Sequence, residues 1–108
     1  MPTPEKKVKD KVKAVLESEG AYYFMPPANG YGRSGVPDII ACVNGFFLAI
    51  ETKANGNKPT ALQIREIETI RRNNGVAVVV DETNWDMVRD MVKRLKGTSI
   101  IASSGGAV

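Results

Sequence analysis

The dipeptide Asn44-Gly45 constrains this chain more than any other feature of its sequence. It lies between two apolar runs, residues 39–43 and 46–54. Asn-Gly favours a two-residue type I′ turn, whose twist matches that of two antiparallel strands. The pattern therefore predicts a tight β-hairpin. Because both faces of its strands are apolar near the turn, we expect the hairpin in the middle of a covered sheet.

A helix and a strand are predicted before the hairpin. Thr3, Pro4 and Glu5 are typical of a helix N-terminus, and Gly20 is typical of the position just after a helix. Residues 21–25 are rich in aromatic side chains and predict a short strand.

Three further elements are predicted after the hairpin. Isoleucines at helical spacing over residues 64–70 indicate a helix that ends near Gly75, and residues 76–80 indicate a buried strand. Thr83 with Asp86 resembles a capping arrangement for a last helix.

The order of these elements is helix, strand, hairpin of two strands, helix, strand, helix. It predicts a single α/β domain at residues 1–97, in which helices flank a central mixed sheet. Residues 98–108 are mostly small and all uncharged, and we expect a C-terminal tail there.

The rarity of two residue types limits the kinds of catalytic site that the chain can form. The chain has no histidine and one cysteine. Ser-His-Asp triads, histidine zinc sites, cysteine clusters and internal disulfides are therefore excluded. A site built from carboxylates favours a hard cation such as Mg²⁺ or Mn²⁺, so metal-assisted hydrolysis is the leading class of reaction.

The charge and hydropathy of the chain bear on its partners. Fifteen Lys and Arg against twelve Asp and Glu give a net charge of +3, which is compatible with a polyanion. The lysines crowded into the first helix fit a solvated face as well as they fit phosphate contacts. No apolar run is long enough to span a bilayer, and no signal peptide is recognisable, so we expect a cytoplasmic protein without membrane contact.

The hairpin geometry brings ionisable residues together. In a two-residue turn, paired residues have numbers that sum to 89, so Asp38 lies opposite Glu51. Like charges roughly 5 Å apart destabilise the pairing unless a cation lies between them. Side chains alternate along a strand, so Lys53 shares the face of Asp38 and Glu51 while Thr52 points the other way.

These groups are suited to phosphodiester hydrolysis. A metal held by Asp38 and Glu51 could bind a phosphate oxygen and acidify a water molecule, while Lys53 could orient that water or stabilise charge on the phosphate. The alternative is that Glu51 and Lys53 are surface residues and that Asp38 is a turn former after Pro37. The convergence of all three on one face favours the functional interpretation.

Glu5 and Gln63 are further candidates, because each projects into the apolar side of its predicted helix. Glu5 either stabilises the helix dipole or is a third carboxylate near the metal. Gln63 either hydrogen-bonds into the site or is a partly buried structural glutamine.

Together these residues resemble the VRR-NUC branch of the PD-(D/E)xK nucleases. The resemblance rests on Gly35-Val36-Pro37-Asp38, Ile50-Glu51-Thr52-Lys53, Gln63 and Glu5. It implies a restriction-endonuclease-like core, αβββαβ plus a C-terminal helix, and Mg²⁺ or Mn²⁺ as cofactor. By resemblance, Asp38, Glu51 and the Thr52 carbonyl are metal ligands, Lys53 is the catalytic lysine, and Glu5 and Gln63 support the site.

Small members of this family resemble dimeric junction-resolving nucleases of viruses and bacteria. Our main hypothesis is therefore a homodimeric endonuclease for branched DNA such as four-way (Holliday) junctions, because one small domain offers little surface for a junction. A nuclease for plain duplex or single-stranded DNA and a non-catalytic nucleic-acid-binding module are the alternatives. Arg33, Ser34 and Lys58 are expected to contact DNA, although residues 26–34 match no pattern.

Overall fold

A computed structural model describes residues 2–27 and 32–99 of the chain. The observed order of elements is the predicted one. The elements are α1 (Pro4–Ser18), β1 (Tyr22–Phe24), β2 (Ile39–Val43), β3 (Phe46–Thr52), α2 (Ala61–Arg72), β4 (Val76–Val80) and α3 (Met87–Lys96). Most of the expected tail at 98–108, from residue 100 on, and residues 28–31 of the glycine-rich loop lie outside the described residues.

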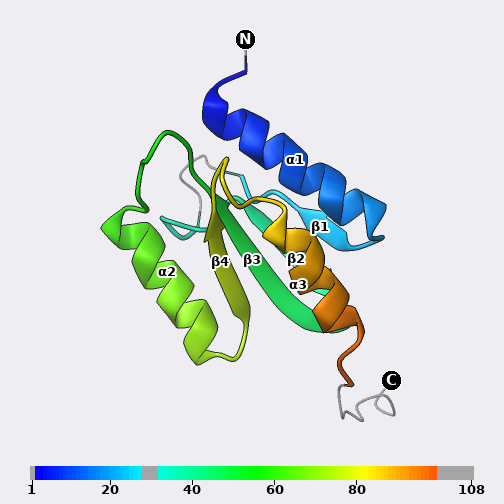
Figure 1. The fold of residues 1–108 in the computed structure, drawn as a ribbon. Helices are drawn as coiled ribbons and strands as arrows, with labels where there is room; N and C mark the ends of the chain where they lie inside the picture. Colours follow the sequence, from blue (N-terminus) through cyan, green and yellow to red (C-terminus); the bar gives the residue numbers. More distant parts are fainter. Residues whose placement is uncertain (1, 28–31, 100–108) are drawn as a thin grey trace.

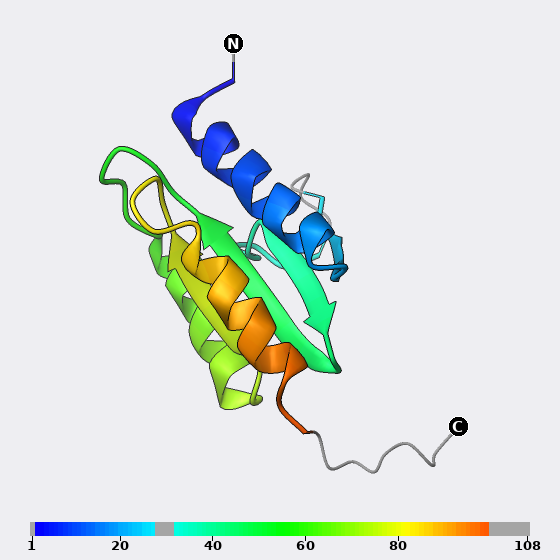
Figure 2. The ribbon, with the colours of Figure 1, turned by 45° about the vertical axis from the view of Figure 1, so that its right-hand side comes forward.

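The four strands form one mixed sheet in the order β1-β2-β3-β4. β1, β2 and β3 pair antiparallel, whereas β4 joins β3 in parallel. Helices α1 and α3 lie on one face of this sheet and α2 lies on the other (Figures 1 and 2). The α/β class and the flanked mixed sheet are therefore as the sequence predicted. None of the helices in the described part of the chain is long and apolar enough to cross a membrane.

The hairpin has the register that its turn predicts. Asn44 and Gly45 both have positive φ, 52° and 84°, as a type I′ turn requires. The β2–β3 ladder runs from Val43 opposite Phe46 to Ile39 opposite Ile50. The paired numbers sum to 89 throughout, so Asp38 and Glu51 follow directly after the last pair of the ladder.

The two faces of the sheet are covered unequally. The main core lies between the sheet and helices α1 and α3, and residues such as Leu16, Leu48 and Val92 are fully buried there. On the opposite face α2 covers Ala49 and Ala77. Our expectation that the hairpin lies in the middle of the sheet is confirmed, but the second face is covered only in part. Phe47 on β3 is 47% exposed there, because α2 packs on β4 and does not reach across β2.

The helix ends confirm one cap and correct another. The Thr3 hydroxyl accepts a hydrogen bond from the Lys6 amide at 3.1 Å, as expected for an N-cap. By contrast, α3 is preceded by Asp86, whose side chain makes no capping hydrogen bond. Thr83 is not a cap either, because its hydroxyl donates to Asp81 Oδ1 at 2.6 Å.

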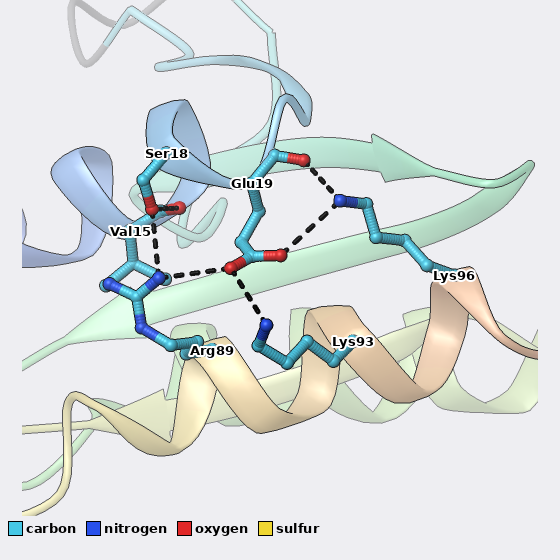
Figure 3. A network of polar contacts seen from close by, with 6 residues as sticks. All are labelled: Val15, Ser18, Glu19, Arg89, Lys93 and Lys96. Atoms are coloured by element: carbon cyan, nitrogen blue, oxygen red, sulfur yellow. Dashed lines mark hydrogen bonds and ion pairs between the residues drawn. The ribbon is translucent and has the colours of Figure 1, made fainter.

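Helices α1 and α3 are joined by what we call the Glu19 cluster: Glu19 with Arg89, Lys93 and Lys96. The Glu19 carboxylate lies between these three cations of α3 (Figure 3), at 3.0, 3.6 and 3.4 Å respectively. Burial alone would raise the pKa of Glu19, but the hydrogen bonds from Lys96 and Arg89 and the charges of Lys93 and Lys96 lower it overall. The cluster holds the C-terminus of α1 against α3, and its three cations more than compensate the charge of Glu19.

Candidate active site

Asp38 lies in a bend immediately before β2, where the Gly35-Val36-Pro37-Asp38 segment enters the sheet. Its Oδ2 accepts hydrogen bonds from the Thr52 amide at 3.0 Å and from the Thr52 hydroxyl at 2.7 Å. The prediction that Thr52 points away from Asp38 is therefore wrong. Asp38 precedes the first residue of β2 and is not held in the ladder, so its carboxylate reaches across the end of β3.

Glu51 is buried near the end of β3, with 1% of its surface exposed. Its Oε2 accepts a hydrogen bond from Gln63 Nε2 at 2.9 Å and lies 3.3 Å from Lys53 Nζ. Its Oε1 is buried and has no hydrogen-bond partner among the described residues. One oxygen of the carboxylate is thus fixed by the protein, and the other is unpaired within the part of the chain that the structure describes.

The pKa of Glu51 is raised from 4.5 to about 7. Burial is the largest cause, followed by the negative charge of Asp38, and Glu5 adds a smaller contribution of the same sign. The hydrogen bond and positive charge of Lys53 act in the opposite direction but do not offset these effects. The site therefore carries more negative charge than its own lysine balances.

Gln63 is held in place by the start of α2. Its Oε1 accepts a hydrogen bond from the Thr60 amide at 2.9 Å, and its own amide donates to the Thr60 hydroxyl at 3.2 Å, which together form a capping box. Because Oε1 is engaged with the helix cap, the Nε2 group is the one that faces Glu51. The helix N-terminus thereby fixes a donor for the buried carboxylate.

Gly35 sets the distance between the Asp38 segment and α2. Its φ is +81°, and a Cβ at this position would lie 2.6 Å from both the backbone carbon and the backbone oxygen of Leu62. Only glycine combines this conformation with so close an approach to another backbone. Gly35 therefore brings Asp38 and Gln63, which come from different elements, to the same cleft.

That cleft has a volume of about 390 Å³ and is lined by Asp38, Gln63, Ser34, Arg33 and other residues of the loop before β2. Beside it lies a mostly apolar groove of about 590 Å³, on the open half of the sheet face next to α2. Arg33 and Pro37 line both. The groove is larger, but Asp38 and Gln63 line the smaller cleft, and the buried Glu51 lies behind it, joined to Gln63 by a hydrogen bond.

The remaining predicted residues fall at different distances from this cleft. Glu5 is half-buried on α1, and its charge acts on Glu51 although no hydrogen bond joins the two. Ser34 is exposed at the cleft. Lys58 is exposed in the loop between β3 and α2, where its charge acts on Asp81, and it lines none of the cavities found in the described part of the chain.

Arg33 is held at the cleft by a partner that the sequence analysis missed. Its guanidinium makes hydrogen bonds of 2.7 to 3.1 Å to both carboxylate oxygens of Glu66 on α2. The Glu66 side chain is 7% exposed, whereas that of Arg33 is 67% exposed. The sequence around Glu66 gave no sign of this contact, because Arg33 lies 33 positions earlier in the chain.

Lys9 is a second residue that the sequence analysis missed at the site. Its Nζ lies 3.9 Å from Asp38 Oδ1. Lys9 follows Glu5 by four residues, so on a helix the two point about 40° apart. The inward direction assigned to Glu5 could therefore have indicated Lys9 as well.

The residues present fit a divalent cation of the Mg²⁺ type. Glu51 offers an unpartnered buried oxygen, and Asp38 Oδ1 is approached only by the Lys9 ammonium among the described residues. In the described ranges no group of three or more Asp, Glu, His or Cys residues is gathered as a metal cage. Mg²⁺ characteristically binds through one or two carboxylates and keeps several waters or phosphate oxygens, so two carboxylates are sufficient.

Known proteins with similar sequence and structure indicate that this chain is a nuclease. No family model matches the sequence. The chain is 49% identical over 69 residues to the protein named "Putative nuclease p44" of Acyrthosiphon pisum secondary endosymbiont phage 1, a match that spans 63% of this chain and 70% of that protein. A solved VRR_NUC domain has the same fold with a TM-score of 0.66 and 28% identity, covering 84% of this chain and 96% of its own. The chain belongs to the VRR-NUC family of PD-(D/E)xK nucleases.

Two more distant structures share the VRR-NUC fold. A second VRR_NUC domain protein is 22% identical with a TM-score of 0.64, covering 88% of this chain and 89% of its own. Hjc of Archaeoglobus fulgidus, a Holliday junction resolvase, is 16% identical with a TM-score of 0.57, covering 83% of this chain and 98% of its own. The restriction-endonuclease-like core implied by the sequence is therefore the observed fold.

Proposed function

We propose that this VRR-NUC protein is an endonuclease that cuts branched DNA, such as four-way junctions, and requires Mg²⁺ or Mn²⁺. The observation that carries the proposal is the buried Glu51 carboxylate, with one unpartnered oxygen, beside Asp38 and Lys53. A buried carboxylate with its pKa raised by another carboxylate destabilises a fold and is typical of a functional site.

In this proposal Asp38, Glu51 and the Thr52 carbonyl hold the cation. When bound there, a divalent cation supplies Lewis acidity to a phosphate oxygen and makes a water molecule more acidic. The Thr52 hydroxyl and amide keep Oδ2 of Asp38 in place, so that Oδ1 faces the cleft. Gln63 does the same for Glu51, since it holds Oε2 and leaves Oε1 free.

Lys53 is the residue proposed to stabilise the transition state. Its side chain is 12% exposed and its amide donates to the Val80 carbonyl at 2.9 Å, so it is fixed at the junction of β3 and β4. An ammonium held in so dry a position stabilises negative charge developing on the phosphate more strongly than one in water. Glu5 adds negative charge near the cation, while Arg33, Ser34 and Lys58 are proposed DNA contacts.

Branched DNA is proposed as the substrate on two grounds. Hjc, which has this fold, is named as a Holliday junction resolvase. A domain at residues 1–97 presents little surface to a junction, so a homodimer would supply two cutting sites related by symmetry. The phage origin of the p44 relative supports action in a bacterial cytoplasm.

The test uses labelled four-way junction, flap, duplex and single-stranded DNA, each with Mg²⁺, Mn²⁺ or EDTA. We expect the junction to be cut fastest, only with metal, and the Lys53→Met variant to be slower by about 10²- to 10³-fold. Lys93→Met removes the same charge from the Glu19 cluster and should cut at the wild-type rate. Circular dichroism would confirm that both variants are folded.

Each other outcome removes a stated part of the proposal. Equal cutting of duplex and junction would remove the branched substrate, and cutting in EDTA would remove the metal. Binding without cutting under every metal would make the protein a nucleic-acid-binding module. Sedimentation of a one-to-one complex with junction DNA would remove the homodimer.

A further inference from the structure

We propose that Lys9 of α1 is a phosphate-binding residue of the active site, which neutralises Asp38 in the free protein and transfers to the DNA backbone when a divalent cation binds. The proposal rests on the nuclease function proposed above and adds a residue from the lysine-rich helix to it. Four observations support it: the contact with Asp38, the weakness of that contact, the position of Lys9 between two cavities, and the different roles of its neighbours.

The contact between Lys9 and Asp38 involves the oxygen that faces the cleft. Both Thr52 donors bind Asp38 Oδ2, at 3.0 and 2.7 Å, whereas Lys9 Nζ lies 3.9 Å from Oδ1. Asp38 Oδ1 is the oxygen assigned to the cation. Lys9 therefore provides, in the free protein, the positive charge that a bound cation would provide.

The Lys9 contact is weak enough to be exchanged. A separation of 3.9 Å is too long for a hydrogen bond, and the Lys9 side chain is 31% exposed. A lysine ammonium on a flexible four-carbon stem can turn toward a new partner without moving the helix. A divalent cation bound by Asp38 and Glu51 would repel the Lys9 ammonium and favour its movement to a new partner.

Lys9 also lies where DNA phosphates would pass. It lines the cleft with Asp38 and Gln63, and it lines a second cavity of about 410 Å³ along α1, together with Glu5 and Lys13. Among the lysines of the described residues, it is the one that borders both cavities. Lys13 follows one turn later, about 6 Å along the helix, and extends the positive charge away from the cleft.

The neighbouring lysines have other partners or directions. Lys6 forms an exposed ion pair with Asp10 at 2.9 Å, and Lys11 lies over the Trp85 ring at 5.2 Å. Lys7 is exposed and, two residues before Lys9, points about 160° away from it on the helix. Lys7 is therefore a matched control, since it offers the same charge on the same helix but away from the site.

The first experiment measures metal binding without DNA. Titration calorimetry with Mn²⁺ would compare the wild type with Lys9→Met and Lys7→Met. Because Lys9 competes with the cation for Asp38, we expect Lys9→Met to bind Mn²⁺ several-fold more tightly and Lys7→Met to bind as the wild type does. Equal affinity in all three proteins would overturn the exchange between Lys9 and the cation.

The second experiment measures DNA binding over a range of salt concentrations, with Mn²⁺ present and in the Lys53→Met background, in which cutting is slowed. Lys9→Met should weaken binding and reduce the slope of log affinity against log salt by about one, the loss expected for one phosphate contact. Lys9→Arg should keep the slope, and Lys7→Met should change it less than Lys9→Met does.

An unchanged slope in Lys9→Met, or an equal loss in Lys7→Met, would overturn the phosphate contact even if Mn²⁺ binding rises. If Lys9→Met does not fold, Lys9→Gln takes its place in both experiments. A wild-type protein that cuts no DNA with either metal would instead overturn the proposed function. The two failures are therefore distinguishable.

Discussion

Two glutamates of this protein have opposite surroundings. Glu19, with its side chain 10% exposed, lies within 4 Å of three cations, and its pKa is lowered. Glu51, with its side chain 1% exposed, has one lysine at 3.3 Å and a neighbouring aspartate, and its pKa is raised to about 7. The charge of one glutamate is thus more than compensated by its neighbours, whereas the other is left with excess negative charge around it.

The difference separates a structural role from a functional one. The Glu19 cluster lies between α1 and α3 (Figure 3), and the single carboxylate in it is surrounded by three cations. A buried carboxylate without such balance costs stability. In the proposed function, a cation from outside would restore this balance at Glu51, whose Oε1 has no partner among the described residues.

Two glycines allow this comparison to be tested through the backbone. Gly35 at the active site and Gly20 beside the Glu19 cluster have similar positive φ, 81° and 70°. A Cβ on Gly20 would meet nothing within 4 Å, whereas one on Gly35 would lie 2.6 Å from the Leu62 backbone. Gly20→Ala should lower the free energy of unfolding by about 1–2 kcal/mol, because alanine is strained at positive φ.

In urea unfolding, Gly35→Ala should lower the free energy of unfolding clearly more than Gly20→Ala does, because α2 must also move. Its cleavage rate should fall further than its folded fraction, since the movement separates Gln63 from Glu51. Equal losses of stability in the two variants, with normal cleavage by folded Gly35→Ala, would show that this loop does not set the site.

The two glutamates should also respond to pH with opposite signs. The folded pKa of Glu51 lies above its ordinary value of 4.5, so its contribution to stability is present below that pH and is lost as pH rises through about 7. The folded pKa of Glu19 lies below 4.5, so its contribution is present above that pH and is lost as pH falls through the lowered pKa.

Urea unfolding in EDTA from about pH 2 to 8 would measure this, with Glu51→Gln and Glu19→Gln as references that do not titrate. The stability of the wild type relative to Glu51→Gln should decrease between about pH 4.5 and 7. Relative to Glu19→Gln it should increase as pH leaves the acid range. Two curves of the same sign would contradict the contrast.

The sequence predicted the site as far as local rules reach. The Asn44-Gly45 turn fixes the register, and the register brings Asp38 and Glu51 to the same end of the hairpin. The helical direction of Gln63 leaves two alternatives, a hydrogen bond into the site or a structural role, and in the structure its Nε2 donates to Glu51 Oε2 at 2.9 Å.

The missed features depend on long-range packing or on the end of an element. The hydrogen bonds from Thr52 to Asp38 form because Asp38 lies just outside the ladder, where strand alternation no longer decides the direction of a side chain. The Glu19 cluster joins side chains about 70 positions apart, and Arg33 with Glu66 about 33 apart, so both depend on how helices pack.

The most direct test of the account is a Mn²⁺ titration by calorimetry at pH 8, without DNA, on the wild type, Glu51→Gln and Glu19→Gln. If the excess charge around Glu51 forms a metal site, the wild type and Glu19→Gln bind with similar affinity, and Glu51→Gln loses that binding. If Glu51→Gln binds Mn²⁺ as well as the wild type does, the central claim is wrong.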